Sequence, residues 1–239
     1  MLQRIATRPV DVAVLPAANR RKKLLIADMD STMIGEECID ELGLLAGVGP
    51  KIMAITARAM AGELDFEGAL RERLALMAGL ESARISEIIE GRLTFTPGGS
   101  ELIATMKAHG ARTALVSGGF IQFTSHVAER LGFDEHRANE LLLESGKLTG
   151  KAREPILGQA AKLNALRQIT AEMAISPEDA IAVGDGANDI PMLAAAGLGV
   201  AFRAKPKVKA SAPVIIDHGD LTALLYLQGY RREEFAKPI

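Results

Sequence analysis

The chain has 239 residues, of which 48% are hydrophobic and 24% are charged, and its formal net charge is −2. These values are typical of a globular protein with room for one full domain and a smaller one, and they give no reason to expect nucleic acid or an anionic membrane as a partner. Aromatic residues make up only 4% and tryptophan is absent, which disfavours stacking platforms for bases.

Cysteine usage and hydropathy indicate a cytoplasmic protein. Cys38 is the only cysteine in the sequence, so no intramolecular disulfide can form, as is usual in a reducing compartment. No segment approaches the roughly 18 apolar residues of a membrane span, and the first residues lack the apolar core of a secretory signal. Cys38 itself is expected to be a small buried hydrophobe.

Residues 1–23 are expected to form an N-terminal extension that is too short for a domain. Val10, Val12 and Val14 alternate with other residues and would allow an edge strand, although prolines bracket them closely. The basic tetrad at 20–23 is expected to be a solvated flank of the strand that follows.

The apolar run 24–27 is followed at once by Asp28 and Asp30. A short apolar run with polar flanks is typical of a buried strand in a parallel sheet, and ligands of such sheets bind beyond the carboxyl ends of the strands. If the strand continues to Asp30, both carboxylates point to the same side. Two buried carboxylates this close need a positive charge nearby. The alternative is a simple turn, in which Asp and Ser are common.

The segment 36–91 has helical periodicity almost throughout, with apolar residues recurring at intervals of three and four. Gly49-Pro50, Gly62 and Gly79 divide it into short helices. Several helices are too many for a simple crossover between two strands. We therefore expect a helical-bundle cap at 36–91, inserted into an α/β core made of 24–35 and 92–239.

Strands and helices alternate after the cap. The expected strands are 113–116, 179–183, 198–202 and 214–216, with a hairpin over 141–149. The expected helices begin at Thr96-Pro97, at Phe120, at Gly158, at Pro191 and at Leu221. This order predicts an α/β fold with a doubly wound parallel sheet.

Polar clusters follow the apolar runs at several places in the chain. They are Asp28 with Asp30, the triplet Ser117-Gly118-Gly119, Lys162 on a later helix, and Gly184-Asp185-Gly186-Ala187-Asn188-Asp189. If the predicted sheet is right, all of them lie at one edge. Each cluster alone is ordinary, since Ser-Gly-Gly is usually a loop and a helical lysine is usually solvated.

Together these clusters describe a site for phosphoryl transfer. Three neighbouring acids imply a divalent cation, and hard carboxylate oxygens suit Mg²⁺, which also takes phosphate oxygens as ligands. Glycine lets the backbone approach an anion closely, and a lysine suits a phosphate as a point charge. A metal, an anion cradle and a free carboxylate are the parts that such chemistry needs.

In this order, the same clusters resemble the four motifs of the haloacid dehalogenase superfamily of phosphatases, over roughly residues 24–227. Within that superfamily the chain is similar to the phosphoserine phosphatases. The segments 36–41 and 146–150 also look like that family's, and Met60, Phe66 and Arg73 fall where its cap contacts the substrate. The resemblance implies a Mg²⁺-dependent enzyme that hydrolyses O-phosphoserine, a small molecule, in the last step of serine biosynthesis.

The resemblance also implies a role for each residue. Asp28 would be the nucleophile that forms an aspartyl-phosphate, and Asp30 the general acid and base. The metal would be held by the Asp28 side chain, the Asp30 backbone carbonyl and Asp185, with Asp189 behind them. The residues implied to bind the substrate are Glu37, Met60, Phe66, Arg73, Ser117, Gly118, Lys162 and Asn188. Among these, Glu37 would meet the substrate ammonium and Arg73 its carboxylate.

Other interpretations remain open at this level. On patterning alone, Met60 and Phe66 would be core residues of the helical bundle and Arg73 part of a surface ion pair. A related phosphatase, or an enzyme that passes the phosphoryl group to homoserine, would carry the same motifs. A phospho-acceptor signalling domain also gathers acids, a hydroxyl and a lysine around Mg²⁺, but it has no use for a large helical cap.

Overall fold

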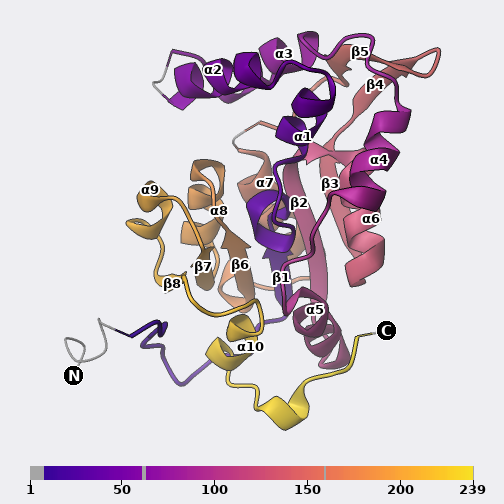
Figure 1. Cartoon of the computed structure of the whole chain (residues 1–239). Helices are drawn as coiled ribbons and strands as arrows, with labels where there is room; N and C mark the ends of the chain where they lie inside the picture. Colours follow the sequence, from indigo (N-terminus) through magenta and orange to yellow (C-terminus); the bar gives the residue numbers. More distant parts are fainter. Residues whose placement is uncertain (1–7, 61–62, 159, 239) are drawn as a thin grey trace.

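A computed structural model describes residues 8–60, 63–158 and 160–238 of the chain (Figure 1). Within these residues the main sheet has six strands in the order β3-β2-β1-β6-β7-β8, and every neighbouring pair is parallel. The strands are β1 (Leu24–Ala27), β2 (Arg112–Phe120), β3 (Glu135–Asn139), β6 (Ala180–Gly184), β7 (Leu198–Phe202) and β8 (Val214–Ile216). The predicted doubly wound α/β fold is confirmed.

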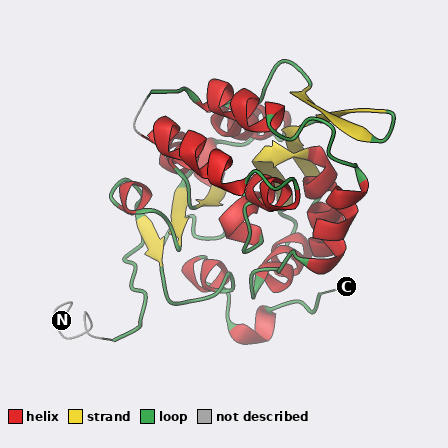
Figure 2. Cartoon of the chain, turned by 45° about the horizontal axis from the view of Figure 1, so that its top comes forward, coloured by secondary structure: helices red, strands yellow, loops and turns green. Residues whose placement is uncertain are grey.

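Helices cover both faces of this sheet (Figure 2). One face packs against α5 (Gly99–Ala108), α6 (Ile121–Leu131) and α10 (Ala223–Leu227), and the other against α7 (Ala161–Glu172), α8 (Ile190–Ala195) and α9 (Pro206–Lys209). In β1, Leu25 and Ala27 belong to the first core and Leu24 and Ile26 to the second. A strand buried on both faces needs apolar residues at every position, which is why 24–27 is an unbroken apolar run.

The strand order reverses next to β1. The chain passes from β1 outward through β2 to β3, then returns to β6 on the other side of β1 and continues to β8. The carboxyl ends of β1 and β6 therefore lie side by side at the point where the order reverses, which is where ligands bind in open sheets.

The helices α1 (Cys38–Leu45), α2 (Gly49–Met60), α3 (Phe66–Ala75) and α4 (Ala83–Gly91) occupy the chain between β1 and β2. The two segments that lead into and out of them pair with each other: the Gly35 N–H donates to the Thr94 carbonyl at 2.9 Å, and the Thr96 N–H to the Met33 carbonyl at 3.0 Å. We call residues 36–91 the cap; its boundaries as a separate unit stay a prediction.

The predicted hairpin is present as β4 (Leu141–Glu144) and β5 (Lys147–Ala152), which pair antiparallel. It lies against the cap at the top of Figure 1, a contact that the sequence did not indicate. The Leu148 carbonyl accepts from the Gly79 N–H at 2.8 Å, and the Leu148 N–H donates to the Leu80 carbonyl at 2.8 Å. The cap is therefore joined to the rest of the chain in two places: by the paired segments that lead into and out of it, and by the β4–β5 hairpin.

Several predicted boundaries were wrong. The helix expected from Thr96-Pro97 begins at Gly99, because Gly98 adopts a left-handed conformation with φ 82° and ends the preceding turn. Strand β2 continues through Ser117-Gly118-Gly119 to Phe120, which precedes α6 instead of starting it. The edge strand β3 was not predicted, because its sequence Glu-His-Arg-Ala-Asn is polar.

The N-terminal segment is an anchor and contains no strand among its described residues, 8–23. Val10 and Val14 are exposed, while the Asp11 carboxylate accepts hydrogen bonds from the backbone N–H groups of residues 217–219. The basic tetrad is a solvated flank only in part: Arg20, Arg21 and Lys23 are exposed, but Lys22 is buried. Lys22 donates to the Glu178 carbonyl, and Arg20 donates to the last carbonyls of α10.

No helix in the described part of the chain has the length and apolar character needed to cross a bilayer.

Replacing Asp11 by alanine should lower the free energy of unfolding by about 1–2 kcal/mol at pH 7, because the loop at 217–219 loses its acceptor. Burial raises the pKa of Asp11, but the three N–H donors outweigh burial and the net pKa is lowered. The contribution is therefore present above the pKa of the unfolded carboxyl and disappears as the pH falls through the folded value. Urea unfolding at pH 7 and pH 3 tests this.

Asp11→Asn is the matched control, since it keeps an acceptor oxygen and should lose less stability than Asp11→Ala. Equal urea midpoints for Asp11→Ala and the parent at pH 7 would contradict the anchoring role.

Candidate active site

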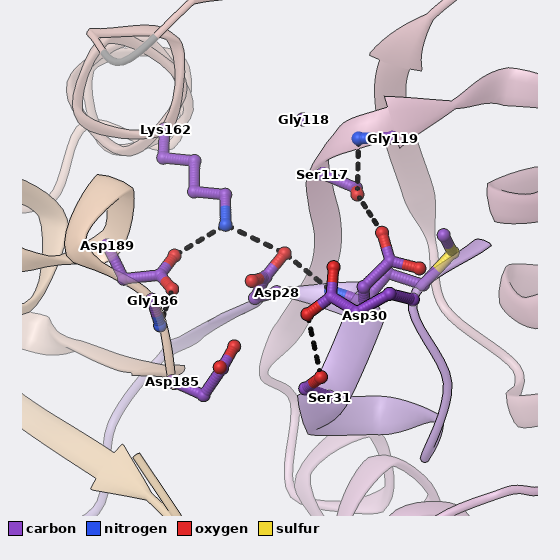
Figure 3. Close-up of polar contacts among 12 residues, drawn as sticks. Asp28, Asp30, Ser31, Ser117, Gly118, Gly119, Lys162, Asp185, Gly186 and Asp189 are labelled. Atoms are coloured by element: carbon purple, nitrogen blue, oxygen red, sulfur yellow. Dashed lines mark hydrogen bonds and ion pairs between the residues drawn. The ribbon is translucent and has the colours of Figure 1, made fainter. Parts of the chain in front are cut away.

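The polar clusters of the sequence meet in one pocket at the carboxyl ends of the strands (Figure 3). Asp28 follows β1, Asp185 follows β6, and Ser117 with its two glycines lies near the end of β2. Lys162 reaches the same place from α7. The sheet order explains the convergence, because β2, β1 and β6 are neighbours and run in the same direction.

Lys162 lies between two buried carboxylates. Its ammonium is 2.7 Å from Asp28 Oδ1 and 2.5 Å from Asp189 Oδ1, and the lysine is only 3% exposed. Burial lowers the pKa of Lys162, but Asp28 and Asp189 outweigh burial and the net pKa is raised. The lysine therefore stays charged and supplies one of the positive charges that the acids require.

Asp28 also accepts a hydrogen bond from the Met29 N–H at 2.7 Å. Burial and the neighbouring Asp189 raise the pKa of Asp28, and Lys162 opposes this shift. A single ammonium does not neutralise both acids, so the site has a demand for further positive charge.

A divalent cation fits this demand. Asp28, Asp185 and Asp189 each offer a carboxylate oxygen, and these oxygens lie within 4.8 Å of one another. Both oxygens of Asp189 already have partners, Lys162 and the Gly186 N–H at 2.9 Å. Asp28 and Asp185 are the acids with an oxygen left to face a metal; the place of Asp189 behind the metal ligands stays a prediction.

Strand β1 ends at Ala27, so the condition under which Asp28 and Asp30 would point to one side is not met. A tight turn follows over Met29–Met33, in which Asp30 is extended with φ −64° and ψ 137° and Ser31 has φ 55°. The turn buries Met29 completely and still directs both acids into the same pocket. Local backbone geometry therefore achieves what a longer strand was expected to do.

Asp30 has an environment different from that of Asp28. Its carboxylate accepts from the Cys38 N–H at 3.0 Å and from the Ser117 hydroxyl at 3.3 Å, with no lysine in contact among the described residues. Burial, followed by the nearby Glu37, raises the pKa of Asp30 to about 6. Cys38 is itself buried, and burial raises the pKa of its thiol.

The two glycines after Ser117 make room for their neighbours. A Cβ atom on Gly119 would lie 2.8 Å from Asp30 Oδ2, and one on Gly118 would lie 2.9 Å from the ring of Phe66. Phe66 begins α3, so this contact joins the cap to the core directly above the pocket. The Gly119 N–H donates to the Ser117 hydroxyl oxygen at 2.9 Å, which fixes the orientation of that hydroxyl.

The cap contributes charged groups to the pocket wall. Glu37 precedes α1 and accepts from the Ser31 hydroxyl at 2.8 Å. Arg73 is half-buried on α3, and its Nε donates to the Ala69 carbonyl at 3.2 Å. Burial lowers the pKa of Arg73, opposed by Asp40 and Glu37.

The structure brings together nearly every residue that the sequence singled out. Those that line the pocket are Asp28, Asp30, Glu37, Phe66, Arg73, Ser117, Gly118, Asp185 and Asn188. Lys162 contacts Asp28 and Asp189, and Asp189 also accepts from the Gly186 N–H. Met60 is the last residue of α2, and its side chain lies outside the part of the chain that the structure describes.

Lys205 is a pocket residue that the sequence analysis missed. Its ammonium lies 3.4 Å from Asp185 Oδ2 and 3.9 Å from Glu37 Oε1. It stands three residues after β7, so the rule that polar residues at strand ends gather at one edge would have found it. Arg203 and Lys207, on either side of it, made it look like part of an ordinary basic surface.

Comparisons with known proteins agree with this geometry. Residues 25–194 match the family model of the haloacid dehalogenase-like hydrolases. A phosphoserine phosphatase of Albidiferax ferrireducens is 46% identical over 210 residues, which cover 86% of this chain and 89% of that protein. A phosphoserine phosphatase of Lactococcus lactis is 46% identical over 204 residues, which cover 85% of this chain and 94% of the relative.

Solved structures are similar as well. A phosphoserine phosphatase with a phospho-aspartyl intermediate analogue superposes with a TM-score of 0.80 at 42% identity, covering 86% of this chain and 98% of that one. A substrate-bound phosphoserine phosphatase gives a TM-score of 0.80 at 41% identity with the same coverage. The chain therefore belongs to the haloacid dehalogenase-like hydrolase family and, within it, to the family of the phosphoserine phosphatases.

Proposed function

We propose that this chain hydrolyses O-phosphoserine to serine and phosphate, the last step of serine biosynthesis, through an aspartyl-phosphate on Asp28 and with Mg²⁺. The observation that carries this proposal is the unequal environment of two acids in one pocket. Asp28 contacts the ammonium of Lys162, whereas the Asp30 carboxylate accepts hydrogen bonds from a hydroxyl and an amide N–H. Acids whose surroundings separate their pKa values can divide nucleophilic and proton-transfer roles. The cytoplasm remains the proposed location.

In the first half of the reaction an oxygen of Asp28 forms a bond to phosphorus, and the bond between phosphorus and the serine oxygen breaks. Asp30 gives its proton to the departing serine oxygen. The pKa of about 6 supports this role, because the protonated fraction of an aspartate with an ordinary pKa would be too small near neutral pH.

In the second half, Asp30 is a carboxylate and takes a proton from water. That water attacks phosphorus, the bond between phosphorus and Asp28 breaks, and phosphate leaves. Asp30 then carries a proton again, so the enzyme returns to its starting state. One residue performs both proton transfers because it lies beside Asp28 in the same pocket.

The phosphoryl group would be bound by Ser117, the Gly118 N–H, Lys162 and Asn188. Mg²⁺ would be held by the Asp28 side chain, the Asp30 backbone carbonyl and Asp185, and it would neutralise charge on the phosphoryl oxygens. The choice of Asp28 and Asp185 is supported by their position: each offers a carboxylate oxygen to a common ion, whereas both oxygens of Asp189 already have partners.

The cap residues would select the substrate. Glu37 meets the ammonium of phosphoserine, and Arg73 binds its carboxylate through the planar guanidinium. Phe66, which lies over Gly118, and Met60 would exclude water from the phosphoryl group. The half-buried position of Arg73 in the pocket wall supports this reading over a surface ion pair.

Asp28→Asn should lower kcat for phosphoserine at least about a thousandfold, because the nucleophile is lost while the fold keeps an isosteric side chain. Phosphate release measured under saturating substrate tests this. Glu129→Gln, an exposed residue of α6 far from the pocket lining, should match the parent. Turnover by Asp28→Asn near the parent rate would overturn the assignment.

Removal of divalent cations should abolish phosphate release, and Mg²⁺ should restore it. In Asp185→Asn the Mg²⁺ concentration for half-maximal rate should rise at least about tenfold, because a ligand with full charge is lost. The measurement is a Mg²⁺ titration of initial rates after chelation. An Asp185→Asn curve that coincides with the parent curve would exclude Asp185 as a ligand.

Arg73→Ala should lower kcat/KM for phosphoserine by about 10- to 100-fold, and for an aryl phosphate without a carboxylate by less than about threefold. Arg71→Ala is the matched control on the same helix, since Arg71 pairs with Glu154 outside the pocket. An equal loss on both substrates would show that Arg73 does not read the carboxylate. Phosphohomoserine formation in the presence of homoserine would instead indicate a phosphotransferase.

A further inference from the structure

Lys205 is the pocket cation to which the proposed reaction gives no task. It precedes α9, and its backbone N–H donates to the Asp185 carbonyl at 3.1 Å, which ties the residue to the end of β6. Its ammonium then reaches back over the pocket edge to the carboxylates of Asp185 and Glu37. One residue thus contacts an acid of the core and the first acid of the cap.

The two acids that Lys205 contacts are both among those to which the proposed function assigns a cationic ligand. Asp185 would hold the divalent cation, and Glu37 would hold the ammonium of the substrate. Lys205 itself carries a charge at neutral pH: burial lowers its pKa, but Asp185 and Glu37 outweigh burial. A fixed positive charge therefore stands beside both cation-binding acids.

We propose that Lys205 is a positioning residue that weakens the affinity of this pocket for cations, the divalent metal at Asp185 and the substrate ammonium at Glu37. The inference rests on the proposed function, because that function assigns these two ligands. The cause is direct competition for the negative charge of the same carboxylates. A pocket lined by Asp28, Asp30, Glu37 and Asp185 would otherwise hold cations more tightly.

The effect should be larger at Asp185 than at Glu37. The side chain of Asp185 is 7% exposed and its contact with Lys205 is 3.4 Å, so solvent screens this interaction less than the one with Glu37, although the Lys205 side chain itself is 53% exposed. Glu37 is 41% exposed and its contact is 3.9 Å, a geometry in which ion pairs contribute little. Removing the charge of Lys205 should therefore change the affinity for the metal at Asp185 more than the affinity for the substrate ammonium at Glu37.

The test is Lys205→Met, which keeps the apolar stem and removes the charge. After chelation of metals, Mg²⁺ is titrated while thermal unfolding is recorded, so that cation binding is measured without turnover. The apparent dissociation constant for Mg²⁺ should fall about three- to tenfold. Lys205→Arg should stay near the parent. Lys207→Met, at an exposed lysine in α9, controls for the loss of one surface charge.

An unchanged or weaker affinity for Mg²⁺ in Lys205→Met would overturn the proposal for the metal, as would a parent protein that Mg²⁺ does not stabilise. Lys205→Gln is the second variant if Lys205→Met does not fold. Phosphoserine hydrolysis by the parent is measured in parallel: a parent that turns over while the variant shows no shift separates failure of this inference from failure of the proposed function.

The proposed effect of Lys205 on binding of the substrate ammonium at Glu37 is tested by comparing phosphoserine with an aryl phosphate. In Lys205→Met the KM for phosphoserine should fall about twofold relative to the KM for an aryl phosphate, which has no ammonium. If Lys205 instead binds an anionic group of the substrate, the KM for phosphoserine rises, and the proposal for Glu37 is overturned.

Discussion

The contact of Lys162 with Asp28 and Asp189 is the interaction on which the site depends. A lysine that is 3% exposed is stable only because two carboxylates approach it within hydrogen-bonding distance. The same contact orients Asp28 and occupies Asp189, which also holds the backbone at Gly186. Removing Lys162 would leave two buried carboxylates without their shared ammonium, and removing either acid would leave Lys162 with one carboxylate. Charge balance and the placement of Asp28, the proposed nucleophile, therefore cannot be separated.

Strand order brings these three residues together. Asp28 follows β1, Asp189 follows β6, and Lys162 comes from α7, the helix that covers the face shared by both strands. The hydrogen bond from the Asp28 N–H to the Val183 carbonyl at 3.0 Å extends the pairing of β1 with β6 to Asp28. Asp28, the proposed nucleophile, is thus held by the sheet itself, while Asp30, the proposed general acid and base, stands on a turn beyond it.

The cap meets the core through contacts of different kinds. Phe66 packs over Gly118, Glu37 accepts from Ser31, and Lys205 links Glu37 to Asp185. The hairpin adds backbone hydrogen bonds to the segment at 79–80. Apolar packing, hydrogen bonds and ion pairs therefore all join the cap to the core at this boundary.

The sequence alone determined the fold class, the helical insertion and most of the pocket, because buried parallel strands are continuously apolar and their ends carry the polar residues. Tertiary structure decided what depends on contacts between distant segments. The polar edge strand β3, the hairpin against the cap and the anchoring of Arg20 and Lys22 have no local signal. The same holds for Lys205, since only the folded chain shows that a lysine in a basic stretch faces Asp185 and Glu37.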